Sequence, residues 1–281
     1  MKNIITVFFL TVSSFCFTQG VELFKQSYIL QPNVFSLYNS VLIPVPVKEQ
    51  YVLAGYSNEL HRHSFESINK FIGHKWLFGT LLKLGDMKQH NLTLLGMVNL
   101  NTIENNSARE VRPSGLLLYR NKNKSGFSFV SGLYYSHEFF GHFFVPAVGF
   151  TLKKNRLKLD ALVPIKGSVN LAWGEGNTLG LAFLGRIKSF STTLFSGAYM
   201  HSVENNVSSF VEFNLFKPLF LRFDAGAVLG RQYDYYSFED QLNLGVSIIK
   251  IGQRQQPFNE KVMQSVPFLS ATLSLKVSEK K

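Results

Sequence analysis

Alternation of apolar with small or polar side chains constrains the fold of this chain more than any other feature. It is clearest over residues 144–163, where Phe150 and Leu152 alternate with Gly149 and Thr151. A period of two places successive side chains on opposite faces of a β-strand. Alternating segments recur from about residue 75 onward and are separated by turn residues. The pattern therefore predicts an all-β, antiparallel fold.

Two hairpins can be given a register from the sequence. A two-residue turn at 154–155 is predicted because asparagine tolerates positive φ, and it pairs Leu152 with Leu157 and Gly149 with Asp160. Each face of that hairpin is then self-consistent, one apolar and the other small or polar.

The second predicted hairpin turns at residues 216–218. Its register places Glu212 opposite Arg222, and pairs of opposite charge at such positions favour a sheet. Phe210 then lies opposite Asp224, so this face is mixed and not purely polar.

Both a soluble β-sandwich and a transmembrane β-barrel fit this alternation, since the first buries its apolar face and the second turns that face to lipid. Hydrophobic residues make up 46% of the chain and aromatic residues 14%. No apolar run after the N-terminus reaches the roughly 18–20 residues that a transmembrane helix needs. This composition, with the N-terminal segment described next, favours a transmembrane barrel of about 12 strands, within a range of roughly 10–14.

Residues 1–18 have the three-part layout of a secretory signal peptide. Lys2 supplies a positive start, residues 4–17 are mostly apolar, and Thr18 is a small residue directly before Gln19. The layout predicts an exported protein that is cleaved before Gln19.

The predicted mature chain is one outer-membrane barrel domain, residues 19–281. The single cysteine, Cys16, would be lost with the signal peptide, so no disulfide is expected. The outer membrane of a Gram-negative bacterium implies contact with outer-membrane lipid, lipopolysaccharide and the barrel-assembly machinery.

The chain is basic, with 29 Lys and Arg against 18 Asp and Glu, a formal net charge of +11. Cleavage would remove Lys2 and leave 28 − 18 = +10. The basic residues are scattered singly or in pairs, without a nucleic-acid-binding motif, so no nucleic acid partner is expected. The excess charge is typical of solvated loops, or of a protein that attracts lipid phosphates or a small anionic solute.

A more specific pattern lies between residues 132 and 184. Residues 141–149 read Gly-x-Phe-Phe-x-Pro-x-x-Gly, and Leu162, Val163 and Pro164 follow after a charged turn. This stretch resembles an uncharacterised family of Gram-negative outer-membrane β-barrels, known only as a domain of unknown function. The resemblance implies a barrel in the outer membrane and implies no activity, so it assigns no functional residues.

Three sequence patterns invite a chemical reading that their spacing does not support. His137 and His142 are five residues apart, whereas the helical zinc motif needs a spacing of four. His61 and His63 could share one face of a strand, but the spacing fixes no third metal ligand beside them. These two residues and His74 are therefore predicted to be loop histidines. The glycines of residues 174–180 lack the strand-to-helix context of a dinucleotide site and predict a hairpin turn instead. No cofactor or metal site is therefore expected.

The polar face of the predicted barrel is the remaining functional feature. The charged side chains best placed to line its lumen are Lys158, Asp160, Glu212, Arg222 and Asp224. Three functions stay open: a channel or passive transport barrel for small solutes, a structural or surface-interaction barrel with a plugged lumen, and a membrane-embedded lipid hydrolase. No Gly-x-Ser-x-Gly motif occurs and no spacing pairs a nucleophile with a base, so the sequence predicts no enzyme.

We expect the exported protein to begin at or near Gln19, because the apolar segment ends at the small residue Thr18. N-terminal sequencing of protein from the membrane fraction measures this. An intact Met1 on that protein would contradict the prediction.

Overall fold

The computed structural model describes residues 21–32, 34–48, 50–63, 70–84, 89–103, 111–123, 126–192, 198–237, 239, 242–246, 249–251, 257, 259–263 and 265–277. Every regular element in these ranges is a β-strand. No helix that is long and apolar enough to cross a membrane occurs among them. The all-β, antiparallel class predicted from the alternation is confirmed.

The strands, in chain order, are β1 (Val21–Gln31), β2 (Val34–Val47), β3 (Gln50–His63), β4 (Lys70–Leu84), β5 (His90–Ile103), β6 (Arg112–Lys122), β7 (Phe127–Glu138), β8 (Gly141–Lys154), β9 (Leu157–Val163), β10 (Lys166–Trp173), β11 (Asn177–Thr192), β12 (Ala198–Phe216), β13 (Leu219–Ser237), β14 (Leu242–Val246), β15 (Ile249–Ile251), β16 (Asn259–Met263) and β17 (Val266–Val277).

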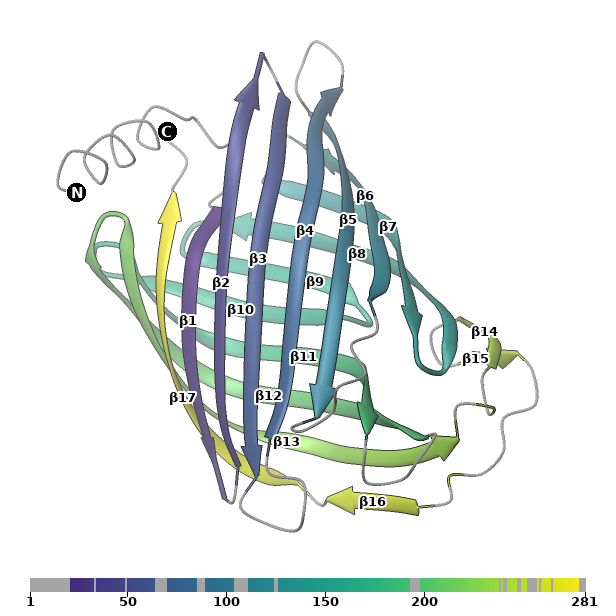
Figure 1. Cartoon of the computed structure of the whole chain (residues 1–281). Helices are drawn as coiled ribbons and strands as arrows, with labels where there is room; N and C mark the ends of the chain where they lie inside the picture. The colour runs from purple at the N-terminus through teal and green to yellow at the C-terminus, as the bar shows by residue number, and fades with distance from the viewer. Residues whose placement is uncertain are drawn as a thin grey trace, which may run out of the picture.

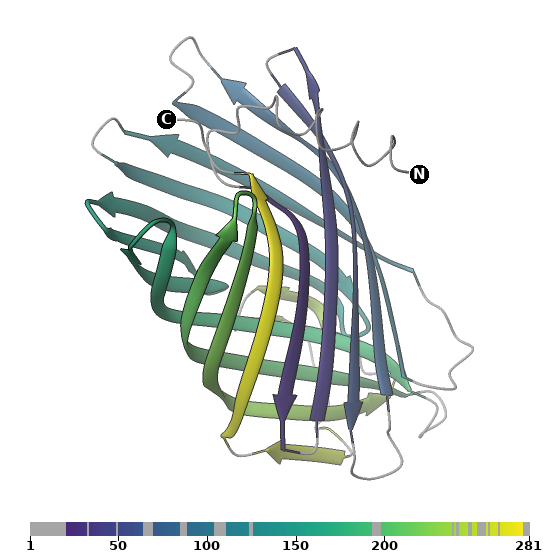
Figure 2. The ribbon, with the colours of Figure 1, turned by 90° about the vertical axis from the view of Figure 1, so that its left-hand side faces the viewer.

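Fourteen of these strands form a closed barrel. Strands β1 to β12 each pair antiparallel with the next, and β17 pairs with both β13 and β1. Figure 2 shows the yellow β17 beside the purple β1, where the ring closes. The barrel has 14 strands, more than the predicted number of about 12, and the count is even, as in single-chain bacterial barrels.

Three short strands lie outside the ring. Strand β16 pairs with the end of β13, β14 runs parallel to the start of β8, and β15 pairs with β14. All three belong to the long connection between β13 and β17 (Figure 1). The sequence predicts a barrel strand at 241–249, whereas β14 (Leu242–Val246) lies outside the barrel wall.

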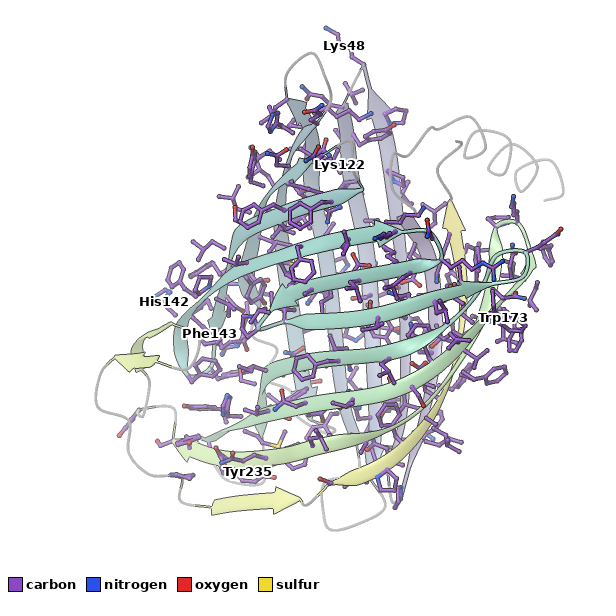
Figure 3. The ribbon with its side chains drawn as sticks, turned by 180° about the vertical axis from the view of Figure 1, so that it is seen from behind. Lys48, Lys122, His142, Phe143, Trp173 and Tyr235 are labelled. Carbon is purple, nitrogen blue, oxygen red and sulfur yellow. The ribbon has the colours of Figure 1, made fainter. Side chains whose placement is uncertain are left out.

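The two ends of the barrel differ in their connections. At the end where β1 begins and β17 ends, every connection has two to five residues, and we refer to it as the turn end. At the opposite end, the loop end, the connections reach 28 residues, from 238 to 265. Lys48 lies at the turn end and Tyr235 at the loop end (Figure 3).

The predicted register of the β12–β13 hairpin is confirmed. Glu212 faces Arg222 and Phe210 faces Asp224. The predicted register of the β8–β9 hairpin is wrong by one turn residue, since Lys154 pairs with Leu157. Asn155 does take the positive φ, at 52°, but as the first residue of the turn and not the second.

The assignment of side chains to the two faces of β8 and β9 is unchanged by this correction. Each β8 residue pairs with a β9 residue two positions further along the chain than predicted, and a shift of two keeps the face. Leu152 now faces Leu159, and Thr151 faces Asp160. A shift of one residue would have turned every side chain to the other face.

Strand β1 was not predicted from the sequence. Its alternation is hidden by the adjacent apolar residues Leu23 and Phe24, where the pairing with β17 contains a bulge between Glu22 and Phe24. The sequence also predicts long loops at 57–73 and 230–240, because alternation is weak there, but β3 continues to His63 and β13 to Ser237.

The outer face of the barrel carries exposed apolar side chains. Phe78 is 60% exposed, Leu181 58% and Leu269 62%. On β1 to β4 this surface is interrupted by Gln26, Asn39, Asn58 and His74, which lie side by side in register. Asn39 donates a hydrogen bond to Asn58, and the Tyr56 hydroxyl is 2.7 Å from Nδ1 of His74.

We expect Phe150→Arg to impair assembly and Thr151→Arg to be tolerated. Phe150 is exposed on the outer face, whereas the Thr151 hydroxyl donates to Asp160 on the other face. In a membrane the first change costs about 2–4 kcal/mol, while the second places the new charge beside a carboxylate. Folded yield, read from gel mobility of unheated samples, measures the difference.

Single cysteines at the same two positions, in a Cys16→Ser background, give an independent reading. Cysteine at 150 should react with lipid-soluble reagents and cysteine at 151 with aqueous ones. The reverse order would show that the assignment of faces is wrong.

Candidate functional site

A contact across the lumen identifies the inner face of the barrel. The Lys188 ammonium on β11 pairs with the Glu59 carboxylate on β3. These two strands are not neighbours in the sheet, so the contact passes through the interior. Side chains in register with Lys188 on successive strands therefore share its inner face.

The five charged residues predicted to line a lumen all share the face of Lys188. On β9, Asp160 lies opposite Ser168 of β10, which lies opposite Ala182, six residues from Lys188 along β11. Asp160 accepts a hydrogen bond of 2.6 Å from Thr151, and its other oxygen lies 2.7 Å from the Lys158 ammonium.

Register places Glu212 of β12 and Arg222 of β13 on this face too, through the pairing of Thr178 with Glu212. Their charged groups do not pair with each other. Glu212 takes the ammonium of Lys276, whereas Arg222 binds both oxygens of Asp224 and lies 3.6 Å from the centre of the Phe210 ring.

Asp224 also accepts hydrogen bonds from Ser208 and Ser270. Four of the five predicted charges therefore pair with each other along the wall, as Lys158 with Asp160 and Arg222 with Asp224, and the fifth, Glu212, pairs with Lys276. This arrangement is the one expected of a lumen in which charges of mixed sign pair.

The sheet is uneven where β9 and β10 end. Strand β9 has 7 residues and β10 has 8, while β11 has 16 and β12 and β13 have 19 each. The last half of β11 therefore has no β10 beside it, and β8 extends past β9 in the same way. The loop-end part of β11 therefore continues without β10 on one side, while β12 and β13 extend beside it on the other.

These loop-end parts, residues 185–192, 198–203 and 231–237, form what we call the tongue. A bulge at Gly230, with φ of 64°, shifts the register of β13 against β12 where the tongue begins. Bulges of this kind bend a strand and increase its twist. The tongue reaches β5, where Ser191 makes a parallel bridge to Thr102.

Three successive residues of β12 show that both faces of the tongue are covered. Ala198 is 2% exposed, Tyr199 0% and Met200 1%. A barrel strand normally has one face toward solvent or lipid, so burial of consecutive side chains requires a layer on each side. The tongue is therefore an internal strand layer at the loop end.

Each covering layer has its own apolar cluster. The inner face of the tongue packs against β4 in the inner cluster, which consists of Phe71, Phe190, Met200, Tyr233 and Tyr235. The outer face packs against the β7–β8 hairpin in the outer cluster, which consists of Phe139, Phe140, Phe143, Val145, Tyr199 and Tyr236.

A buried carboxylate ties the hairpin to the tongue. Glu138 accepts hydrogen bonds from Ser136 at 2.7 Å and from Ser189 at 2.5 Å. The backbone N–H of Phe139 donates to the Ser189 hydroxyl at 2.9 Å. Ser136 and Ser189 are both fully buried.

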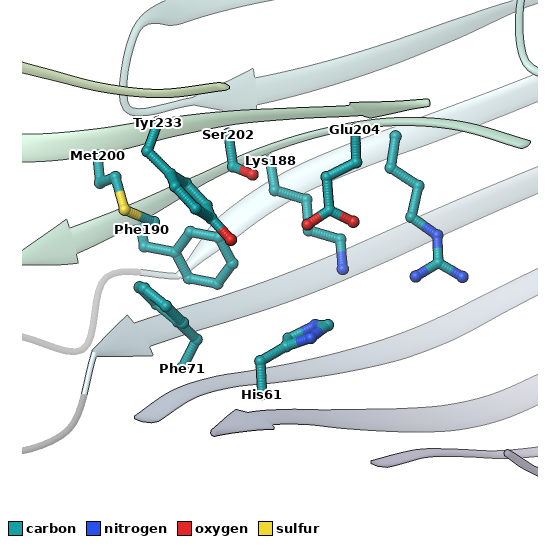
Figure 4. Close-up of a pocket in the computed structure, with 9 residues that line it drawn as sticks. His61, Phe71, Lys188, Phe190, Met200, Ser202, Glu204 and Tyr233 are labelled. Atoms are coloured by element: carbon teal, nitrogen blue, oxygen red, sulfur yellow. The ribbon is translucent and has the colours of Figure 1, made fainter. Parts of the chain in front are cut away.

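A pocket adjoins the inner cluster (Figure 4). Its lining residues come from five strands and are His61, Phe71, Arg186, Lys188, Phe190, Met200, Ser202, Glu204 and Tyr233. One wall is aromatic and the other is charged. Because Lys188 is paired with Glu59, this pocket lies beside a contact that crosses the lumen.

Sequence reasoning did not identify Glu59, Arg186 or Lys188. Glu59 fell in the predicted loop 57–73, and Arg186 lies where alternation continues unchanged into the tongue. Their inward direction follows from strand parity, but the partner of each depends on which strands meet across the barrel.

The structure also places the histidines and glycines that the sequence singled out. His137 and His142 face each other on β7 and β8 with ring centres 4.9 Å apart, so they are strand residues and not loop residues. His61 and His74 also lie on strands, not in a loop, and on opposite faces of the sheet. Gly174 and Gly176 form the predicted β10–β11 turn.

Among the described residues, no group of three or more His, Cys, Asp or Glu side chains could hold a metal ion. Comparisons of the chain with protein-family models, curated proteins and solved structures found no match. Membership of the outer-membrane family that residues 132–184 resemble stays a prediction.

We expect Met200→Ala and Phe71→Ala to lower the free energy of unfolding by about 2–5 kcal/mol each, since both leave cavities in the inner cluster. Leu181→Ala, an exposed position on β11, is the matched control and should change it much less. Urea titration of the folded protein in detergent measures the three values. Equal effects at all three positions would contradict the inner cluster.

Proposed function

We propose that the chain is an outer-membrane β-barrel whose loop end faces the cell exterior, and that it works as a closed surface or interaction barrel instead of a permanently open pore. Of the three functions that the sequence leaves open, the plugged barrel is the one that the geometry supports best.

The outer face supports a membrane location. Large apolar side chains such as Phe78, Leu181 and Leu269 are more than half exposed around the ring. A soluble protein rarely exposes contiguous apolar surface on this scale, whereas a barrel in lipid requires it. Between the turn end and the ends of β9 and β10, the closed ring also leaves the wall without an unpaired edge, which is the condition for strands to cross a bilayer.

The connections support the orientation. Outer-membrane barrels have short periplasmic turns and longer extracellular loops. Connections of two to five residues lie at the turn end, together with the start of β1 and the end of β17. The turn end would therefore face the periplasm, and the tongue would lie toward the cell exterior.

The burial of Ala198, Tyr199 and Met200 is the observation that carries the closed state. A layer of strand with side chains packed on both faces lies at the loop end, between Phe71 of β4 and the β7–β8 hairpin, and this packing supports a closed lumen. The ion pair of Lys188 with Glu59 also joins β11 to β3 across the lumen beside the tongue. Passage of a solute would require the inner cluster to separate.

Cell fractionation tests the membrane location. The protein should be found with the outer membrane and should need detergent for extraction. Recovery from the periplasm without detergent would contradict the barrel in lipid.

We expect no stepwise conductance when the protein is inserted in a planar bilayer, because the tongue fills the loop end. The double variant Phe71→Ala, Met200→Ala should give open steps, since it removes two side chains of the inner cluster. Insertion is verified by protease protection, with Leu181→Ala as the control. Reproducible open steps from the unmodified protein would favour the channel instead.

A further inference from the structure

Basic side chains gather on the inner face of β6 to β10, in the half of the barrel that adjoins the turn end. Lys166 of β10 lies opposite Leu184 of β11, four residues from Lys188, so it shares the inner face. Three register rows of these strands follow from it, and we call them the basic patch. They are Arg120–Val130–Gly149–Leu162–Lys166, then Lys122–Ser128–Thr151–Asp160–Ser168, then Lys153–Lys158–Asn170.

The basic patch has a strong excess of positive charge. Its basic residues are Arg120, Lys122, Lys153, Lys158 and Lys166. The structure describes every residue of the three rows, and Asp160 is the only acidic one among them. The formal charge of the patch is therefore 5 − 1 = +4.

The rest of the charged wall differs from the basic patch. On β12, β13 and β17, Glu212 pairs with Lys276, and Asp224 pairs with Arg222. Acidic and basic side chains are equal in number there, whereas in the basic patch one carboxylate lies among five cations. Mutual neutralisation therefore explains those pairs and does not explain the basic patch.

The charges of the basic patch act on one another and on the facing wall. Lys166 interacts electrostatically with Arg120, Lys158 and Asp160, and also with Lys25 of β1. Strand β1 pairs with β2 and β17, so Lys25 reaches the patch through the lumen. Like charges at such range repel each other, and an anion bound between them would relieve that repulsion.

A buried hydroxyl in the middle row also points to a ligand. Ser128 is 6% exposed, and its Oγ has no hydrogen-bond partner among the described residues. Buried polar atoms are normally hydrogen-bonded. Ser128 lies between Lys122 and Thr151 in register, so an anion held by the patch would have an oxygen within reach of this donor.

The basic patch is open to water on the side of the turn end. The side chain of Lys158 is 50% exposed and that of Asp160 33%. Beside the tongue, the side chains of Lys188 and Glu59 are only 24% and 13% exposed. A solute would therefore reach the patch from the turn end, while the tongue covers the other side.

We propose that the basic patch binds a soluble anion that carries at least two phosphate groups. A phosphate monoester carries about −1.5 to −2 charges at neutral pH, so two groups match the charge of the patch. Arginine binds phosphate oxygens bidentately, and lysine and hydroxyl groups supply further donors. The binding does not rest on the function proposed above, but the compartment from which the anion enters, the periplasm, does.

The width of the basic patch favours more than one phosphate group. Arg120 and Lys166 are separated by four strand spacings of about 4.8 Å, or about 19 Å along the wall. Successive rows are two residues apart, about 6.6 Å along a strand. One phosphate group is too small to contact basic side chains from both edges of such a patch, whereas two linked groups can engage separate sets of them.

Isothermal titration calorimetry with inorganic tripolyphosphate, on protein in a nonionic detergent, tests the site. We expect saturable binding by the unmodified protein. Lys166→Gln and Arg120→Gln should each weaken it about tenfold, because each removes a charged donor, and Ser128→Ala should weaken it about threefold. Lys166 is exposed, so its replacement leaves the packing of the wall unchanged.

Lys83→Gln is the matched control, since it removes the same charge from the inner face of β4 at the turn end. Its ammonium lies 5.3 Å from the centre of the Tyr51 ring, outside the basic patch. This variant should keep the affinity within about twofold. Equal losses in Lys83→Gln and Lys166→Gln, or no binding by the unmodified protein, would overturn the site. Heat-dependent gel mobility verifies that each variant is folded.

Citrate identifies the chemistry of the anion, since it carries several negative charges on carboxylates. We expect citrate to bind at least tenfold more weakly than tripolyphosphate at the same ionic strength. Equal affinity would overturn the assignment of phosphate. Because the titration is done in detergent, open conductance in a bilayer would count against the closed barrel and leave this result unaffected, and absence of binding would leave the closed barrel unaffected.

Discussion

Closure of the backbone hydrogen-bond ladder is the constraint on which the rest of this structure depends. Strand β17 pairs with β13 on one side and with β1 on the other, although the chain between β13 and β17 is the longest connection in the molecule. Without this strand the wall would have two unpaired edges, which lipid does not tolerate. Closure of the ring therefore defines the two ends of the barrel, and it determines which side chains of each strand point outward.

The strands of the closed ring differ in length, and the longer ones extend beyond the ends of the shorter ones. The short strands β9 and β10 stop halfway along β8 and β11, and the remaining length of β11 then runs on with β12 on one side and no β10 on the other. The tongue fills the loop end because its side chains gain more by packing on Phe71 and on the β7–β8 hairpin than by facing water. The position of the tongue at the loop end is thus a consequence of strand lengths together with the bulge at Gly230.

The sequence predicted what alternation can predict. Where one face meets the outside and the other the interior, as at Phe150 and Thr151, parity assigned the faces even though the β8–β9 register was wrong by one turn residue. The register of β12 against β13 was correct because a short turn and an opposite-charge pair agree.

The same reasoning failed where both faces are covered. Ala198, Tyr199 and Met200 do not alternate because each face of the tongue is an apolar interface. The contact of Lys188 with Glu59 was also not predictable, since it joins strands that are not neighbours in the sheet.

The two apolar clusters cover opposite faces of the tongue. The inner cluster joins the tongue to the barrel wall at Phe71, and the outer cluster joins it to the hairpin tip at Phe140. Because each face has its own cluster, loss of a side chain from one cluster leaves the members of the other in place. The two faces of the tongue can therefore be tested separately by substitution.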